Sequence, residues 1–351
     1  MPRIGLVLGA GGIIGASYIT GALEGIRRAT GWEPQAAELI IGTSAGAFIG
    51  GLTAAGLPTW LLHYRCTGEL ARGVSPNDDL IALAERMDRY NEGSWLARYA
   101  PPLRFPRPLL SSPRAVLKGF VAPRRTTPAM VLTGLLPEGV FSIRALSSIC
   151  RTAWPSGWPK QATWVTAIDL ESGRRVVFGR EGAPRTDLHL AVGAACAVPG
   201  IFAPVAISGR RYVDAGSYSP SNLDLAAGLG LDLVVCISPL SCLGQGHGFL
   251  AKGLGLLLGP SVARRLRRER EKVEATGTPV HVVEPTAEDM VAVGWNWMDI
   301  SKRPSVMSVA VRTTHAALCE PRNRWMAEVL RGCMQAPPSW SEVRPAEPGW
   351  H

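Results

Sequence analysis

The sequence contains no stretch of about 18 consecutive apolar residues free of charge, so we expect no membrane-spanning helix. Its seven cysteines are dispersed without C-x-x-C spacing. This spacing argues against a zinc site or a disulfide framework and favours reduced thiols in a cytoplasmic protein. Charged residues make up only 19% of the 351 residues, whereas 46% are hydrophobic. These proportions exclude a disordered chain, and the length favours one large α/β domain.

The net charge is positive, at a formal value of +9, and arginine carries most of it. Such a charge suits an anionic membrane surface or a phosphorylated substrate, although each arginine cluster is also compatible with general solubility. Nucleic acid would fit equally well, but no binding motif accompanies the clusters, so we expect no nucleic-acid partner. Any contact with an anionic membrane is expected to be peripheral.

A strand pattern at residues 39–41 runs directly into Gly42-Thr43-Ser44-Ala45-Gly46, and a helix of small apolar residues follows. A G-x-S-x-G turn between a strand and a helix is typical of a nucleophile elbow. The glycines let the backbone turn sharply, and the start of the helix points its free N–H groups towards the serine. The pattern predicts that Ser44 is a nucleophile, with Gly42 and Gly46 as supports.

A second glycine-rich loop, residues 9–15, lies between a predicted strand at 3–8 and a helix at about 16–30. Such a loop can hold the pyrophosphate of a dinucleotide or form an oxyanion hole. Dinucleotide binding calls for an acidic residue after the second strand. This chain has the apolar run 39–41 leading to Ser44 there, which favours the oxyanion hole.

Elsewhere the pattern predicts strands at 163–169, 174–179, 205–207, 211–213, 232–238 and 280–283, and helices at 76–90, 142–153, 187–197, 261–275 and 303–334. We predict one domain over residues 1–335. Residues 58–145, rich in Pro, Arg and Trp, form an insert that we interpret as a cap or lid governing substrate access, with 95–125 as its centre; a surface linker is the alternative. Residues 336–351 are expected to be a loose tail.

Ser44 requires a base, and the chain offers six histidines and one well-placed aspartate. A pairing of Asp214 with His247, His281 or His315 would have the order of an α/β-hydrolase triad. None of these histidines lies in an obvious catalytic turn. Asp214 follows a short strand and precedes Ala-Gly, where a partly desolvated carboxylate can accept the serine proton directly. A turn-capping role for Asp214 is the alternative.

In these motifs the sequence resembles the patatin-like phospholipase family. Three blocks match in order and spacing: the loop at 9–15, the turn at 42–46, and Asp214-Ala215-Gly216 preceded by the Pro-Gly segment 196–205. The resemblance covers about residues 4–57 and 163–240. It implies a three-layer α/β/α fold with a mostly parallel sheet, and a Ser44–Asp214 dyad without histidine.

The resemblance also implies the remaining site residues and the chemistry. The backbone amides of Gly11 and Gly12 would hold the oxyanion, with Gly15 and Gly216 as further motif glycines, and neither a metal nor a cofactor is required. The expected substrate is a lipid or another acyl ester, cleaved through an acyl-Ser44 intermediate in a phospholipase A-like or lysophospholipase-like reaction. The oligomeric state stays open.

The glycine-rich loop departs from the family pattern at two positions. Ala10 replaces the first glycine, and Ile14 replaces a basic residue that could assist the oxyanion or a phosphate head group. The sequence therefore predicts acyl-ester hydrolysis without fixing the head group. Two alternatives stay open: an acyltransferase or thioesterase-like enzyme that uses the same acyl-serine, and a non-catalytic lipid-binding homologue.

Overall fold

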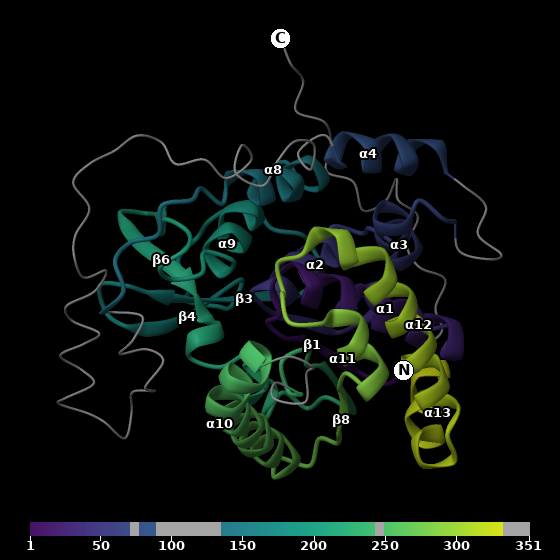
Figure 1. The fold of residues 1–351 in the computed structure, drawn as a ribbon. Helices are drawn as coiled ribbons and strands as arrows, with labels where there is room; N and C mark the ends of the chain where they lie inside the picture. The colour runs from purple at the N-terminus through teal and green to yellow at the C-terminus, as the bar shows by residue number, and fades with distance from the viewer. Residues whose placement is uncertain (71–76, 89–134, 243–248, 333–351) are drawn as a thin grey trace.

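One sheet runs through the part of the chain that the computed structural model describes, residues 1–70, 77–88, 135–242 and 249–332 (Figure 1). Its strands are β1 (Ile4–Leu8), β2 (Leu39–Thr43), β3 (Thr163–Asp169), β4 (Arg174–Phe178), β5 (Val205–Ile207), β6 (Arg210–Asp214), β7 (Leu233–Ile237) and β8 (Val280–Val283). They lie in the order β5-β6-β3-β2-β1-β7-β8, and β4 pairs with β3 outside this path. The five strands from β3 to β8 in this order are parallel, whereas β4 and β6 each pair antiparallel with β3, and β5 pairs antiparallel with β6. The predicted mostly parallel sheet is confirmed.

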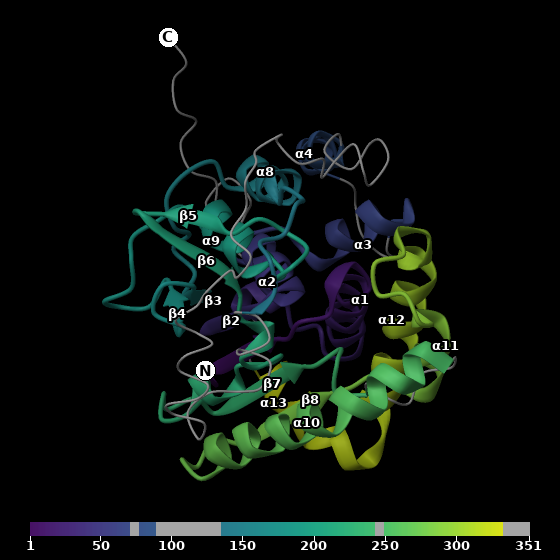
Figure 2. The same cartoon turned by 60° about the vertical axis from the view of Figure 1, so that its left-hand side comes forward.

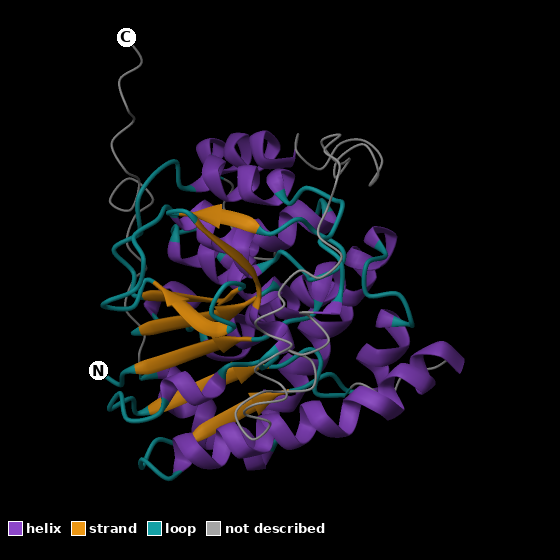
Figure 3. Cartoon of the chain, turned by 90° about the vertical axis from the view of Figure 1, so that its left-hand side faces the viewer, coloured by secondary structure: helices purple, strands orange, loops and turns teal. Residues whose placement is uncertain are grey.

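Helices cover both faces of this sheet (Figure 3). They are α1 (Gly12–Thr30), α2 (Ala45–Ala54), α3 (Thr59–Thr67), α4 (Asp78–Asp88), α8 (Arg144–Ala153), α9 (Leu188–Ala195), α10 (Phe249–Glu274), α11 (Ala287–Val293), α12 (Arg303–Cys319) and α13 (Arg324–Arg331). In the described residues no helix combines the length and the apolar character needed to cross a bilayer.

The alternation of side chains along β1 explains the three layers. Leu6 and Leu8 belong to the larger core, which includes α1 and α2, whereas Val7 belongs to a smaller core on the opposite face. Leu266 and Val273 of α10 line that second core. Because successive residues of a strand point to opposite faces, an all-apolar strand such as β1 needs helices on both sides. Figure 2 shows α10 beside β7 and β8, away from α1 and α2.

Most predicted elements lie within a few residues of their predicted bounds, and the differences have local causes. The helix predicted at 261–275 begins earlier, at Phe249. The prediction missed its first half because the glycines and the proline there are typical of a loop. The helical stretch predicted at 303–334 is interrupted at Pro321, where a proline starts a short turn between α12 and α13. Two helices, α3 and α11, were not predicted.

The predicted insert at 58–145 is described only at its two ends. Its first end contains α3 and α4, and α4 packs against both α3 and α8. The proposed centre of the lid at 95–125 lies outside the described residues, as does the predicted tail at 336–351. The gating role of the insert therefore stays a prediction.

Candidate active site

Ser44 lies at the sharp turn where β2 ends and α2 begins. Its backbone has φ 53° and ψ −120°, a conformation that non-glycine residues rarely adopt. The two motif glycines make the turn sterically possible. A Cβ atom on Gly42 would lie 2.5 Å from Cα of Ala47, and one on Gly46 would overlap the backbone carbonyl of Leu8 in β1. Both glycines are therefore required for α2 to pack this closely on the sheet.

Two further hydrogen bonds fix the turn. The N–H of Gly46 donates to the carbonyl oxygen of Gly9 over 3.0 Å, which joins the elbow to the glycine-rich loop. The thiol of Cys196 donates to the carbonyl oxygen of Ser44 over 3.1 Å. Cys196 is buried, and burial raises the pKa of its thiol well above the usual range, so it remains protonated and able to donate. No local sequence pattern predicts this contact.

Asp214 ends β6, and its carboxylate meets the side chain of Ser44. The residue is only 4% exposed. Its Oδ1 accepts the N–H of Gly216 over 2.7 Å, and the side chain of Ser44 lies close enough to the carboxylate to lower its pKa. Burial raises the pKa of Asp214 to about 6, against the opposing effects of the Ser44 side chain and the N–H of Gly216. The two residues predicted as a dyad are thus brought together although 170 positions separate them.

A buried polar network supports this pair from behind. The side-chain amide of Asn222 donates to the hydroxyl of Thr43 over 2.9 Å, and Thr43 directly precedes Ser44. The hydroxyls of Thr43 and Thr166 are 3.0 Å apart, which ties β2 to β3. Arg175 donates to the amide oxygen of Asn222 over 2.8 Å. The network therefore connects β2, the strand that precedes Ser44, with the loop that follows Asp214.

The glycine-rich loop presents free backbone donors beside Ser44. In the residues that the structure describes, the N–H groups of Gly11 and Gly12 have no hydrogen-bond acceptor. Two glycines keep the loop compact: a Cβ atom on Gly11 would lie 2.6 Å from Cα of Gly15, and Gly12 has φ +62°. The loop thus offers donors at the start of α1, where the helix end carries positive partial charge.

Ile14, which stands where the family pattern has a basic residue, does not face this site. Its side chain is fully buried in the larger core, and its N–H donates to the carbonyl oxygen of Trp297 over 3.1 Å. A longer charged side chain at this position would have to leave the core. The missing basic residue therefore opens no gap in the wall of the site.

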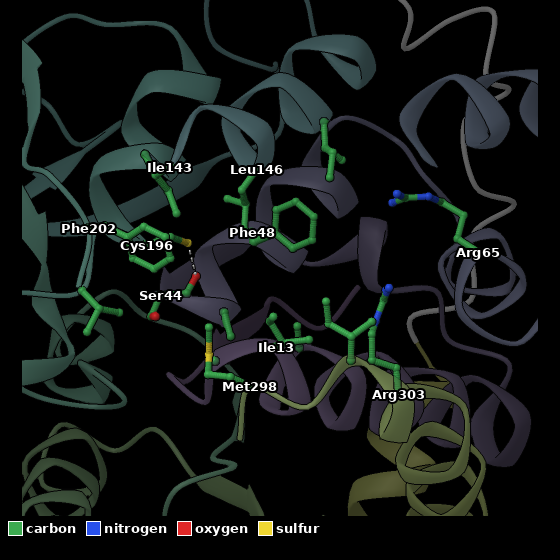
Figure 4. A pocket seen from close by; sticks show the side chains of 16 residues that line it. Ile13, Ser44, Phe48, Arg65, Ile143, Leu146, Cys196, Phe202, Met298 and Arg303 are labelled. Atoms are coloured by element: carbon green, nitrogen blue, oxygen red, sulfur yellow. Dashed lines mark hydrogen bonds between the residues drawn. The ribbon is translucent and has the colours of Figure 1, made fainter. Parts of the chain in front are cut away.

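A cavity of about 110 Å³ opens in front of Ser44. Its walls are mainly apolar, and they come from α1, α2, α3, α8, the segment after α9, the segment before α12 and the start of α12 (Figure 4). The lining side chains that sequence reasoning missed are Arg65, Ile143, Leu146, Ile149, Met298, Ile300 and Arg303. All seven lie outside the segments that resemble the family, and their positions depend on how distant helices pack.

None of the four histidines in the described residues lines this cavity. His281 lies in β8 and packs edge-to-face on Trp325, and burial lowers its pKa to about 4. His315 contacts Cys319 on α12. His247 lies outside the described residues. In the described part of the chain, no group of three His, Cys, Asp or Glu side chains is placed to hold a metal ion.

Comparisons with known proteins bear on the same segments. A family model described as patatin-like phospholipase matches residues 6–227. The chain is 27% identical over 237 residues to uncharacterized NTE family proteins of Mycobacterium bovis and Mycobacterium tuberculosis. This alignment covers 68% of the chain and 49% of each relative, so the chain spans about half of their length.

Among solved structures, the chain is similar to the crystal structure of the type III effector protein ExoU, with 15% sequence identity. The match covers 97% of this chain and 61% of the ExoU chain. The TM-score is 0.28, so the two folds do not superpose closely.

Proposed function

Because the chain belongs to the patatin-like phospholipase family, we propose that it is a serine acyl hydrolase that cleaves lipid carboxylic esters through an acyl-Ser44 intermediate. The observation that carries the proposal is the buried carboxylate of Asp214 beside the side chain of Ser44, which lines an apolar cavity. A serine with a base in direct contact is the usual arrangement of an activated nucleophile.

In the first half-reaction, the Oγ of Ser44 attacks the ester carbonyl carbon while its proton passes to the carboxylate of Asp214. A pKa of about 6 suits this role, because the carboxylate is mostly ionised at neutral pH yet has a higher proton affinity than an exposed aspartate. The free N–H groups of Gly11 and Gly12 are the donors proposed for the tetrahedral oxyanion. Loss of one such donor typically raises the barrier by about 3 kcal/mol.

Collapse of the tetrahedral intermediate breaks the bond to the alcohol, which leaves with the proton held by Asp214. In the second half-reaction, a water molecule gives a proton to Asp214 and attacks the acyl-Ser44 carbonyl. The fatty acid then leaves as Ser44 recovers its proton. Apolar walls around Ser44, including Phe48 and Leu146, suit an acyl chain.

The first experiment is intact-mass spectrometry after incubation with a fluorophosphonate. We expect one adduct on the native chain, none on Ser44→Ala, and labelling slowed by at least about a hundredfold in Asp214→Asn. Ser238→Ala is the matched control, because Ser238 is a buried serine directly after β7 that does not line the cavity. It should be labelled like the native chain.

Labelling of Ser44→Ala at the native rate would exclude Ser44 as the nucleophile, and native-rate labelling of Asp214→Asn would exclude Asp214 as its base. Product analysis then separates hydrolysis from acyl transfer. With a lipid ester and candidate alcohols or amines present together, free acid alone is the result expected of a hydrolase.

A further inference from the structure

The cavity in front of Ser44 has a charged end as well as a reactive one. Figure 4 shows Ser44, Cys196 and Phe202 on one side of the cavity and Arg65 and Arg303 on the other. Arg65 comes from α3 and Arg303 from the start of α12. The side chains of Ile13 and Phe48 lie between the two groups. A molecule that fills the cavity would therefore contact the serine, apolar walls and two guanidinium groups.

Among the described residues, only one of the two guanidinium groups forms an ion pair with a carboxylate. Arg65 is 5% exposed and forms an ion pair with Asp88 at 2.7 Å. Arg303 is half-buried, and its Nη2 donates over 2.7 Å to the thiol of Cys66, the residue next to Arg65. Within residues 1–70, 77–88, 135–242 and 249–332, no carboxylate forms an ion pair with Arg303. Because a neutral thiol is a weak acceptor, the described residues leave one positive charge at the cavity wall uncompensated.

The position of Arg303 in α12 increases this excess of positive charge. Arg303 is the first residue of the helix, Lys302 is its N-cap, and the first turn contains no acidic residue. The nearest carboxylate in the sequence, Asp299, is engaged with the N–H and hydroxyl of Ser301. Cations at the N-terminus of a helix are unfavourable, since that end carries positive partial charge. An anion bound at Arg303 would relieve this repulsion.

We propose that Arg303, with Arg65 beside it, forms a binding site for an anionic group of the substrate. The proposal rests on the proposed function, because it places the reacting ester at Ser44. The substrate would be an ester in which an apolar segment separates the reacting carbonyl from a phosphate or carboxylate. A planar guanidinium binds either group through paired hydrogen bonds, more strongly than it binds a neutral acceptor.

The anion has two chemical sources. It is either a phosphate on the alcohol part of the ester or a carboxylate at the far end of the acyl chain. Lysophosphatidic acid compared with monoacylglycerol tests the first source. The p-nitrophenyl esters of ω-carboxyalkanoic acids, compared with alkanoates of equal length, test the second. In at least one of these pairs we expect the anionic ester to have the higher kcat/KM.

Substitution of Arg303 is the decisive test. In Arg303→Gln we expect the ratio of kcat/KM between anionic and neutral esters to fall by about tenfold or more, the usual loss for a hydrogen bond to a charged group. Arg303→Lys should retain part of the ratio, because the charge remains but the paired geometry is lost. The matched control is Arg312→Gln on the same helix, an exposed arginine paired with Glu288, and its ratio should equal that of the native chain.

A native chain without preference for either anionic ester would overturn the proposal, as would an unchanged ratio in Arg303→Gln. Failure of the proposed function itself is seen separately, because then neither neutral nor anionic esters are cleaved. In that case, calorimetric titration of the Ser44→Ala protein with hexyl phosphate and with hexanol still tests the site. Tighter binding of hexyl phosphate that Arg303→Gln removes would support the site, and equal binding of the two probes would exclude it.

Discussion

The clearest energetic consequence of the site is that Asp214 should destabilise the folded protein when it ionises. The carboxylate is buried, and its pKa rises from 3.8 to about 6. One pKa unit corresponds to 1.36 kcal/mol, so the shift amounts to about 3 kcal/mol. Because the folded protein holds this proton to a higher pH than the unfolded chain, the free energy of unfolding falls as the pH rises from about 4 to about 6.

The substitution Asp214→Asn removes this ionisation while it keeps a carbonyl oxygen that can accept the N–H of Gly216. We expect the variant to lose ester hydrolysis and yet to gain stability. Relative to the native chain, its free energy of unfolding should increase by about 3 kcal/mol between about pH 4 and pH 7. The gain is the usual trade-off at a site where a charged group is buried for chemistry.

The assay is urea denaturation of the native and Asp214→Asn chains at several pH values, extrapolated to zero denaturant. Asp224→Asn is a control with the opposite sign. Burial raises the pKa of Asp224, but its hydrogen bonds and ion pair with Arg175 outweigh this and leave the pKa below its usual range. Asp224→Asn should therefore lose stability near neutral pH, and the loss should shrink as the pH falls through that lowered pKa.

A stability difference between the native and Asp214→Asn chains that does not change with pH would refute the reasoning. It would mean that the carboxylate has an ordinary pKa in the folded protein. A native chain that becomes more stable relative to the variant as the pH rises would reverse the sign and point to an unrecognised cation beside Asp214.

Three further predictions concern the same region. The kcat/KM for a neutral ester should rise with pH through about 6 with the slope of one proton, and a flat pH–rate profile would exclude Asp214 as the base. Gly46→Ala should destabilise by at least about 3 kcal/mol in chemical denaturation, because its Cβ would overlap a carbonyl of β1; Gly193→Ala, with nothing closer than 3.5 Å, is the tolerated control. Asn222→Ala should cost about 2 to 4 kcal/mol and lower kcat, because it removes the hydrogen bond to Thr43; unchanged kcat would restrict the network to stability.

Local patterns predicted the parallel centre of the sheet well. β1, β2 and β7 are short apolar runs bounded by glycine or turn residues, and such runs have few other stable arrangements. Predictions failed where local signals conflicted with packing. The first half of α10 contains glycines and a proline that suggest a loop, yet the residues form a helix.

The sequence by itself determined the sharp turn at Ser44, since Gly42 and Gly46 are needed wherever a strand turns this sharply into a helix, and it marked Asp214 as the candidate base by its place after a strand and before Ala-Gly. Only the tertiary structure decided that Asp214 contacts Ser44, because β3 lies between their strands and long-range pairing is not encoded in any local pattern. The packing of α3 against α12 likewise brings Arg65 and Arg303 to one cavity. The burial that raises the pKa of Asp214 is a property of the folded chain alone, as is the placement of Arg303 against the thiol of Cys66.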